Sequence, residues 1–254
     1  MKTSVIAFAA QKGGVGKTTT TTVVGHGLSL QGKSVVIVDF DPQGQVAVAL
    51  GMKTSPGIFN TLIGRQQLNK VALATGRDNL VVIPGDKRTS TAQTVMYAEG
   101  QDVFQVIYDT FVQPLKGKVD YILFDTSPSV GGLQEAAIFN SDVVISPVAT
   151  EHLALYGFMG TLETVKALKK RGWNGEVIAL PTFYDERTSH SRETLALIKD
   201  QLSQVKIKVL DEIHDATDLK KATKAGQTIF EFDAKSRAAQ EYAKIVWAIK
   251  GMKL

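Results

Sequence analysis

The chain has 254 residues, 44% of them hydrophobic, and a formal net charge of +4, which suits one domain (residues 1–254) with a substantial core. It contains no cysteine, which excludes disulfides and thiolate metal ligands and suits a reducing compartment. No stretch approaches the length of about eighteen apolar residues that indicates a transmembrane helix, and no cleavable signal pattern precedes the first apolar run.

Short apolar runs rich in β-branched residues recur along the chain with longer segments between them. Because these runs are continuously hydrophobic, they indicate strands buried on both faces, as in a parallel sheet. The predicted strands are residues 4–10, 34–39, 79–84, 121–125, 142–148, 176–182 and 206–210. The predicted helices are residues 17–30, 43–50, 57–63, 91–115, 133–140, 153–171, 191–204, 217–224 and 234–250. This alternation predicts an α/β fold with right-handed crossovers and a doubly wound, mostly parallel sheet that carries helices on both faces.

A glycine-rich turn joins the first strand to the first helix, with the sequence Lys12-Gly13-Gly14-Val15-Gly16-Lys17-Thr18. Such a turn lets backbone N–H groups converge on an anion, and the helix N-terminus adds the positive end of its dipole. Gln11 occupies the first glycine position of the strict P-loop pattern, and Lys12 supplies a second cation. A glycine-rich turn without a ligand is the alternative. We favour a nucleotide phosphate site, because the flanking strand and helix are those that the motif requires.

Three acidic residues lie at or just after the ends of predicted strands and should meet this turn, since ligands bind at the carboxyl ends of the strands in such sheets. They are Asp39, Asp41 and Asp125. Phosphoryl transfer requires charge neutralisation, a metal ion and a positioned water. We therefore expect Asp125 to hold Mg²⁺ through water. The alternatives are a strand-end acid that caps a turn for Asp125, and helix N-terminal acids for the other two.

The first residues of the predicted helix complete the expected phosphate site. Lys17 should contact the β- and γ-phosphates, and the Thr18 hydroxyl should coordinate Mg²⁺. Thr19 is a candidate donor to the α-phosphate. Five consecutive threonines, residues 18–22, are unusual in a helix, and only the first two have a clear chemical role at this stage.

The glycine-rich turn resembles the deviant Walker A motif of the ParA/MinD ATPases. Residues 35–44 resemble that family's D-x-D-P-Q-G motif, and residues 121–129 resemble its Walker B strand. Residues 181–188 and 230–242 resemble a later strand–loop and the entry to the last helix of ParA/Soj partition proteins. The similarity runs in order through nearly the whole chain.

The resemblance implies an ATPase with ATP and Mg²⁺ as cofactors, and a homodimer with two nucleotides at its interface. It implies that Lys12 reaches the γ-phosphate bound to the partner subunit, that Asp41 positions the attacking water, and that Asp39 supports the metal shell. ATP then favours the dimer and ADP the monomer. Because no arginine finger is visible, turnover should be slow without a partner protein. Thr182 and Phe183 could line the adenine pocket, although ordinary packing at a strand end explains them equally well.

The net positive charge lies in the C-terminal part of the chain. Residues 1–162 carry 12 Lys and Arg against 12 Asp and Glu, and the remaining residues carry 17 against 13. This distribution suggests a polyanion, either DNA or an anionic membrane, but a solvated surface with a slight lysine excess accounts for it as well. The resemblance implies nonspecific binding of double-stranded DNA. The candidate contacts are Arg187, Lys220, Lys221, Lys224 and Lys244.

One segment departs from the Soj pattern, because Asp215 and Asp218 stand where the family has arginines. The departure predicts a DNA surface that has either moved by about one helical turn or become weaker. It also puts in doubt the adenine contacts that the family makes near this loop.

The resemblance implies a cytoplasmic, nucleoid-associated ATPase that partitions plasmid or chromosomal DNA. Since no helix-turn-helix extension is expected before the first strand, a separate ParB-like centromere-binding protein would supply the sequence specificity, and it would also stimulate hydrolysis. The alternative is a switch like MinD that binds membranes or positions a protein cargo. The C-terminal helix carries Tyr242, Ile245, Val246 and Ile249 at helical spacing, which is better explained by packing on the sheet than by a membrane anchor.

Overall fold

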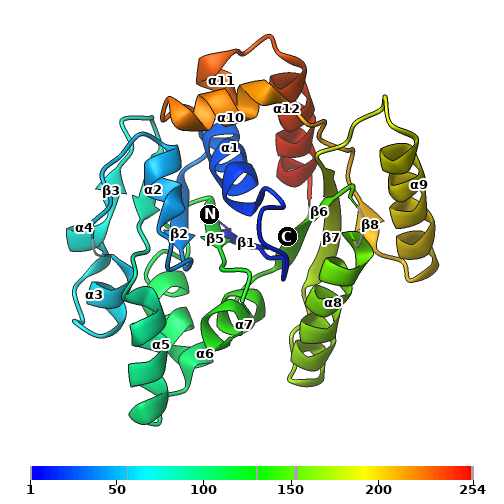
Figure 1. Ribbon diagram of the computed structural model, residues 1–254. Helices are drawn as coiled ribbons and strands as arrows, with labels where there is room; N and C mark the ends of the chain where they lie inside the picture. Colours follow the sequence, from blue (N-terminus) through cyan, green and yellow to red (C-terminus); the bar gives the residue numbers. More distant parts are fainter. Residues whose placement is uncertain (1, 56, 130, 152–153, 253–254) are drawn as a thin grey trace.

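The chain forms an eight-stranded sheet with the strand order β3-β4-β2-β5-β1-β6-β7-β8 (Figure 1). The structure is a computed structural model that describes residues 2–55, 57–129, 131–151 and 154–252. All neighbouring strands are parallel except the antiparallel pair β3 and β4, which confirms the predicted doubly wound, mostly parallel sheet. The strands are β1 (Ser4–Phe8), β2 (Val35–Asp39), β3 (Leu73–Ala74), β4 (Leu80–Ile83), β5 (Tyr121–Asp125), β6 (Val143–Ala149), β7 (Glu176–Thr182) and β8 (Lys208–Val209).

Helices cover both faces of the sheet. In Figure 1, α1, α2 and α10 to α12 lie above the sheet, α3 and α5 to α8 lie below it, and α9 flanks its β8 edge. The helices are α1 (Lys17–Leu30), α2 (Gln45–Ala49), α3 (Ile58–Leu62), α4 (Leu68–Val71), α5 (Thr89–Ala98), α6 (Val103–Ile107), the π-helix η1 (Tyr108–Val112), α7 (Gly132–Phe139), α8 (Ala154–Lys170), α9 (Ser189–Gln204), α10 (Thr217–Lys224), α11 (Ile229–Phe232) and α12 (Arg237–Lys250).

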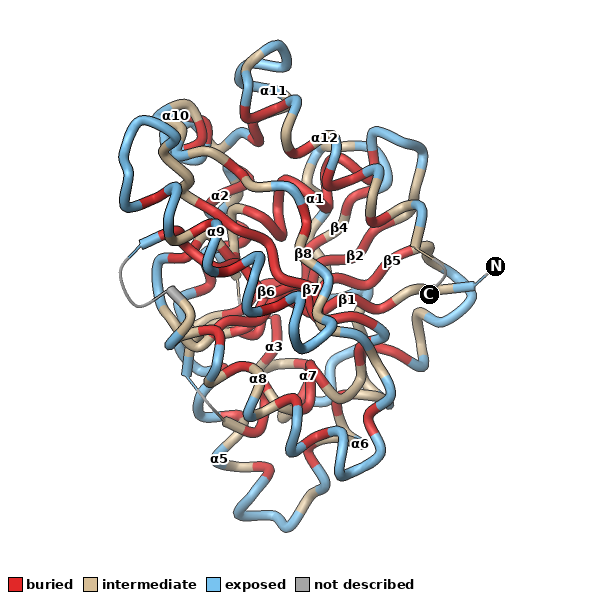
Figure 2. The backbone as a smooth tube through the Cα atoms, turned by 90° about the vertical axis from the view of Figure 1, so that its right-hand side faces the viewer, coloured by how far each residue is buried: buried red, intermediate tan, exposed pale blue. Residues whose placement is uncertain are grey.

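Each central strand serves two hydrophobic cores. In β1, Ile6 and Phe8 belong to the core under α1 and α12, whereas Val5 and Ala7 belong to the core on the opposite face. Because successive side chains of a strand point to opposite faces, a strand covered on both sides must be apolar at every position. Figure 2 shows the resulting continuous burial of β1, β2 and β5 through the middle of the molecule. The continuous apolar runs in the sequence therefore have a simple structural cause.

The predicted helix over residues 91–115 is wrong. The chain instead forms α5, a turn, α6 and η1. Gly100 adopts a positive φ of 66° and ends α5, since Gly100 N and Gln101 N donate to carbonyl oxygens of the last turn. Asp102 then caps α6 by accepting a hydrogen bond from Phe104 N at 3.0 Å. A helix stop and a helix start thus lie only two residues apart.

The predicted C-terminal helix is also shorter at its start than expected. Helix α12 begins at Arg237, after Ser236 caps it by accepting from Ala239 N at 3.2 Å, and the short α11 precedes it. Tyr242, Ile245, Val246 and Ile249 are almost fully buried in the core that α12 shares with α1. The apolar face of this helix therefore packs against the domain, as the sequence favoured. Among the described residues, no helix combines the length and the apolar character needed to cross a bilayer.

Strand register places the acidic ends of β2 and β5 next to each other and beside the end of β1. Phe8 pairs with Asp125, and Asp39 pairs with the same residue from the other side. The carboxyl ends of β1, β2 and β5 thus lie side by side, and the loop from β1 to α1 begins at the same edge. The fold confirms that these motifs converge in space.

Candidate nucleotide-binding site

The loop between β1 and α1 has the backbone of an anion-binding turn. Gly14 and Gly16 adopt φ values of 73° and 89°, in the left-handed region that glycine adopts without strain. Val15 is buried and packs with Ala10, Ala149 and Phe183. The loop is thus fixed by an apolar anchor, while the backbone around it can approach a phosphate closely.

Lys17 is the first residue of α1, and its side chain folds back onto this loop. Its side chain is buried, and Nζ donates to Lys12 O at 3.4 Å. Burial lowers the pKa of Lys17, an effect that the negative charges of Asp125 and Asp41 oppose. A cation held in place by one carbonyl oxygen and two nearby carboxylates can reach phosphate oxygens without a large rearrangement.

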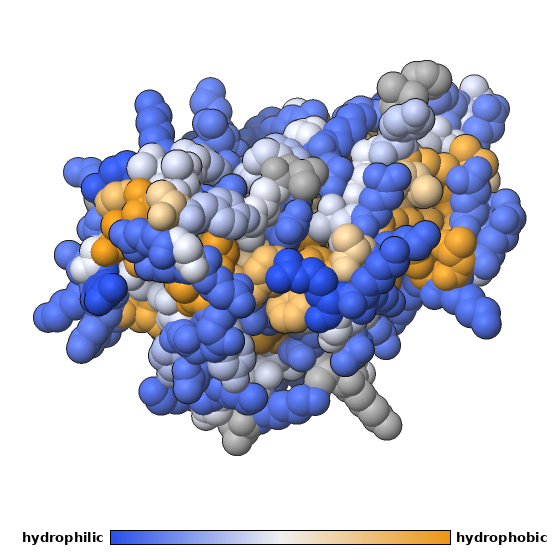
Figure 3. All heavy atoms as spheres, turned by 90° about the horizontal axis from the view of Figure 1, so that it is seen from below, coloured by the Kyte–Doolittle hydropathy of each residue, from blue (hydrophilic) through white to orange (hydrophobic). Residues whose placement is uncertain are grey.

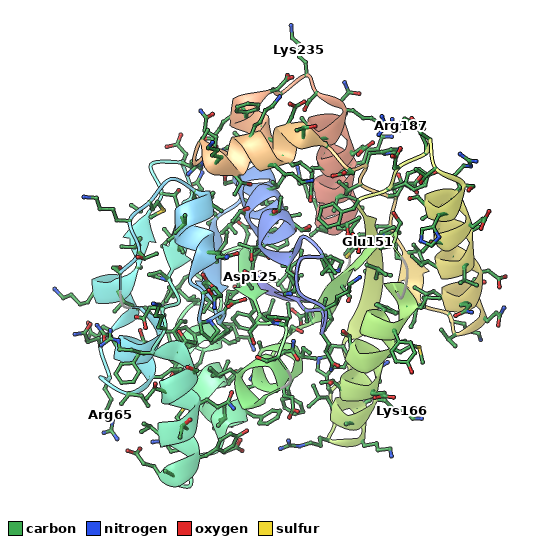
Figure 4. All side chains as sticks on the ribbon, viewed as in Figure 1. Arg65, Asp125, Glu151, Lys166, Arg187 and Lys235 are labelled. Atoms are coloured by element: carbon green, nitrogen blue, oxygen red, sulfur yellow. The ribbon has the colours of Figure 1, made fainter. Side chains whose placement is uncertain are left out.

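Asp125 accepts hydrogen bonds from two threonines of α1. Thr18 Oγ1 donates to Oδ2 at 2.8 Å, and Thr21 Oγ1 donates to Oδ1 at 2.9 Å. Burial raises the pKa of Asp125 to about 6, although both hydroxyls and Lys17 favour the charged form. Oxygen donors of this kind, one hydroxyl and one carboxylate, fit Mg²⁺. Figure 4 shows Asp125 in the centre of the molecule, close to the start of α1.

Asp39 is fully buried and faces its own loop. Its Oδ1 accepts from Asp41 N at 3.0 Å and its Oδ2 accepts from Val46 N at 3.1 Å. Burial, followed by the charge of Asp125, raises the pKa of Asp39 well above its ordinary range. Both carboxylate oxygens are thus used to shape the loop that carries Asp41. The structure favours the supporting role for Asp39, and direct metal ligation stays a prediction.

Asp41 lies at the mouth of the site and is partly exposed. Its Oδ1 accepts from Gln43 N at 2.8 Å, which closes a tight turn after β2. Gly85 packs against the carbonyl oxygens of Asp39 and Asp41 so closely that a Cβ there would come within 2.6 Å of both. The loop that would position the water is therefore held by β2 on one side and by the segment after β4 on the other.

Lys12 makes an ion pair within its own subunit. Its Nζ lies 3.1 Å from Glu151 Oε2, and its methylene chain packs against Gly157 of α8. Gln11 is held by the same helix, because its Nε2 donates to Gly160 O and Thr164 Oγ1, both at 2.8 Å. The first half of the loop is thus tied to α8. The role of Lys12 in a partner subunit stays a prediction.

A cavity of about 320 Å³ opens next to the loop and is large enough for a nucleobase. Thr182 and Phe183 line it together with Thr19 and Gly16, and their contact with adenine stays a prediction. Thr182 Oγ1 donates to Val15 O at 2.9 Å, and Phe183 adopts an uncommon φ of 55° that places its ring over Gly16. The cavity is also lined by Ile213, His214, Ala216, Leu219, Lys220, Thr223 and Tyr242.

Three of the five predicted DNA contacts are paired with a nearby carboxylate. Arg187 binds Asp185 through two hydrogen bonds of 2.8 and 3.0 Å. Lys220 and Lys221 lie 3.3 Å from the aspartates that replace the family arginines. These two ion pairs are Lys220–Asp215 and Lys221–Asp218. Among the described residues, Lys224 and Lys244 are exposed and form no ion pair.

The threonine run has more roles than the sequence suggested. Thr21 binds Asp125, and Thr20 Oγ1 lies 3.1 Å from the hydroxyl of Tyr242 on α12. Thr21 follows Thr18 by three residues and so shares its helix face, a spacing that could have identified it. The contact to Tyr242 joins segments 222 residues apart and has no local signal.

Fold and site together define a P-loop nucleotide-binding protein. The family described as AAA domain matches residues 3–178. The chain is 32% identical over 247 residues to the chromosome-partitioning ATPase Soj of Treponema pallidum, with 94% of each chain covered. The chain therefore belongs to the Soj/ParA family of ATPases.

Two solved structures are similar over nearly the whole chain. A single-residue variant of McdA of Cyanothece in complex with ATP superimposes with a TM-score of 0.87 at 22% identity, covering 99% of this chain and 98% of that one. Cobyrinic acid a,c-diamide synthase of Mycobacterium smegmatis, with a bound ATP analogue and magnesium, gives a TM-score of 0.83 at 28% identity, with coverages of 98% and 94%. At these identities, the first supports the fold alone.

Proposed function

We propose that this chain is an ATP-dependent switch for DNA partition, which binds Mg²⁺ and ATP, dimerises through the nucleotide and holds DNA without sequence preference until ATP is hydrolysed. The observation that carries the proposal is the cluster of Lys17, Thr18 and Asp125 at the carboxyl edge of the sheet, with Asp41 close by. The partition role is supported by the similarity to Soj along almost the entire chain.

Different residues of the site would contribute to different parts of phosphoryl transfer. Mg²⁺, when bound, would neutralise phosphate charge. Thr18 would offer it an oxygen ligand and Asp125 would hold it through water, while Lys17 would contact the β- and γ-phosphates. The backbone N–H groups of the loop, residues 13–18, hold the phosphate chain. The cavity beside Phe183 takes the adenine.

Asp41 is the proposed positioning residue for the attacking water, and Lys12 the contact to the nucleotide of the partner subunit. Asp41→Ala should therefore leave ATP binding intact and trap an ATP-bound dimer. Sedimentation velocity in ATP would measure the dimer, and phosphate release would measure turnover. Normal turnover by Asp41→Ala would remove this residue from the mechanism.

DNA binding tests the proposal as a whole. Binding to a random-sequence duplex is measured with ATP, with ADP and without nucleotide, at low and moderate salt, with Lys17→Ala as the variant that cannot respond to ATP. We expect binding only with ATP, and a steep loss of affinity as salt rises, because phosphate contacts release counterions. A ParB-like centromere-binding protein should then raise the slow turnover and release the DNA.

A switch that acts on a membrane or a protein cargo is the alternative. The buried apolar face of α12 argues against an anchor there, since Tyr242 and Ile249 are 2% and 0% exposed. If no nucleotide state binds DNA, anionic liposomes and protein cargo become the partners to test.

A further inference from the structure

The lower face of the domain carries a second recess of about 920 Å³, remote from the glycine-rich loop. It lies between α3 and α4 on one side and η1 with the following turn on the other, beneath β2 and β4. Val36, Leu62, Val81, Val106 and Leu115 contribute to an apolar floor. On the left of Figure 3, the side on which α3 and α4 lie, apolar atoms show between hydrophilic side chains. Neither the phosphate site nor the proposed DNA surface uses this recess.

The walls of the recess contain two irregular backbone segments. One wall includes the π-helix η1, which supplies Asp109 and Thr110. Helices of this kind are rare and often mark functional sites. In the opposite wall, Arg65 has a φ of 50°, a region that few non-glycine residues occupy. Both irregular segments border the same recess.

The charges at the rim indicate what the recess can accept. Arg65 and Lys118 line it and are exposed, and their side chains have no hydrogen bond or ion pair with other described residues. Asp109, the acidic residue among the lining residues, is already hydrogen-bonded to Gln105 Nε2 at 2.8 Å. Side-chain amides fill much of the remaining rim. An apolar floor with a cationic rim complements an apolar ligand that carries carboxylates.

We propose that this groove binds a helical segment of a partner protein whose apolar stripe is flanked by glutamate or aspartate. Amphipathic helices bind such grooves through apolar residues one helical turn apart, while rim charges select the partner. Its volume of about 920 Å³ suits several side chains of such a helix. We name the recess between α3, α4 and η1 the α3–η1 groove.

Hydrogen bonds and close backbone packing connect the α3–η1 groove with the loop of Asp41. Thr61 Oγ1 donates to Gly57 O at 2.8 Å, and Ile58 N donates to Pro84 O at 3.0 Å. A Cβ at Gly57 would lie 2.4 Å from Pro84 O, and the next residue, Gly85, packs on the carbonyl oxygen of Asp41. A helix that shifts α3 must therefore move this loop. The docked partner thus alters ATP turnover, a consequence that rests on the proposed ATPase, whereas docking itself does not.

Two synthetic helical peptides with the same leucine stripe, one flanked by glutamates and one by lysines, test the docking. Fluorescence anisotropy measures their binding to the full chain without nucleotide, so the result is independent of the proposed ATPase. The glutamate peptide should bind wild type about tenfold more tightly, and the double variant Arg65→Glu/Lys118→Glu should reverse this preference. The control is Lys166→Glu/Lys170→Glu on α8, which changes the net charge equally. Figure 4 shows Lys166 and Arg65 on opposite sides of the molecule.

Equal binding of both peptides to wild type, or an equal effect of the control variant, would overturn the proposal. Self-association of wild type that Arg65→Glu/Lys118→Glu abolishes would assign the groove to a second copy of the chain instead.

Blocking the α3–η1 groove with a covalent label tests its coupling to the Asp41 loop by a second route that needs no docked peptide. Because the chain has no cysteine, Gln66→Cys in the groove wall can be labelled selectively with a bulky maleimide. The label should abolish peptide binding and change ATP turnover at least about twofold, whereas the same label on Lys166→Cys should do neither. Unchanged peptide binding after complete labelling would exclude the groove as the docking site. Unchanged turnover alone would refute the link to Asp41.

Discussion

Neutralising Asp215, which precedes α10, and Asp218, which lies in its first turn, should strengthen DNA binding. In the structure, Lys220 and Asp215 are 3.3 Å apart with side chains 68% and 48% exposed, and Lys221 and Asp218 are 3.3 Å apart with side chains 60% and 43% exposed. Exposed pairs of this kind contribute at most about 1 kcal/mol to stability, so the fold should tolerate Asp215→Asn/Asp218→Asn. The change leaves both lysines without a competing carboxylate.

The expected size of the effect follows from counterion release. Each additional phosphate contact steepens the dependence of log K on log salt by about 0.9, so two lysines add about 1.8. At about 0.1 M salt this corresponds to roughly sixtyfold tighter binding as an upper bound, because a lysine paired with aspartate still exchanges with phosphate part of the time. We therefore expect an affinity gain of about tenfold and a clearly steeper salt dependence.

Fluorescence anisotropy with a random-sequence duplex in saturating ATP, at several salt concentrations, measures both quantities. The matched control is Glu193→Gln/Asp200→Asn on α9, which removes the same negative charge from a helix that flanks the β8 edge, away from α10 in Figure 1. A double aspartate variant with the wild-type salt slope would refute the reasoning, as would an equal gain from the control. Either result would mean that Lys220 and Lys221 do not face the DNA.

Three further predictions concern buried polar groups. Arg77 binds Glu231 through two hydrogen bonds of 2.9 and 2.8 Å and also donates to Leu50 O, so Arg77→Ala should lower the free energy of unfolding in urea by about 3 kcal/mol, and Arg77→Lys should restore only part of it. Burial lowers the pKa of His26, so the unfolded chain takes up a proton that the folded chain refuses, and the contribution of His26 to stability falls as pH drops below about 6.5. Because the raised pKa values of Asp39 and Asp125 act in the opposite direction in both proteins, the measured quantity is the difference in urea unfolding between wild type and His26→Gln, which should shrink as pH falls. Thr21→Val removes a donor to a buried carboxylate and should weaken Mg²⁺-dependent binding of a fluorescent ATP analogue about tenfold, with little change when Mg²⁺ is omitted.

The sequence was sufficient to predict the sheet and the main outline of the site. A strand covered on both faces needs an uninterrupted apolar run, and β5 and β7 occupy the predicted residues without adjustment. Acidic residues at strand ends become neighbours because parallel strands share one carboxyl edge. These inferences depend on local pattern and on general rules of topology, which a single sequence carries.

Contacts between distant segments could not be predicted in the same way. Lys12 meets Glu151 across 139 residues, and no local pattern marks that pair. The interruption near Gly100 is different, because glycine followed closely by the N-cap residue Asp102 is a recognisable stop and start. The apolar spacing on both sides of it favoured one long helix. The sequence near Gly100 thus contained the signal for a helix break, but the apolar periodicity led to the prediction of one continuous helix.

Helix α1 connects the nucleotide site with the C-terminal elements through side chains on successive turns. Thr18 and Thr21 bind Asp125 at the phosphate end, Thr20 contacts Tyr242 of α12, and His26 Nδ1 lies 2.6 Å from Thr228 Oγ1 before α11. A packed helix moves as a unit, since its interior contacts tolerate little deformation. We expect a shift of the loop on phosphate binding to reach α11 and α12 through these contacts. Threonine has a low helix propensity, so the run of threonines weakens α1 locally. Its hydroxyls nevertheless form contacts on both sides of the helix start, with Asp125 at the phosphate end and with Tyr242 of α12.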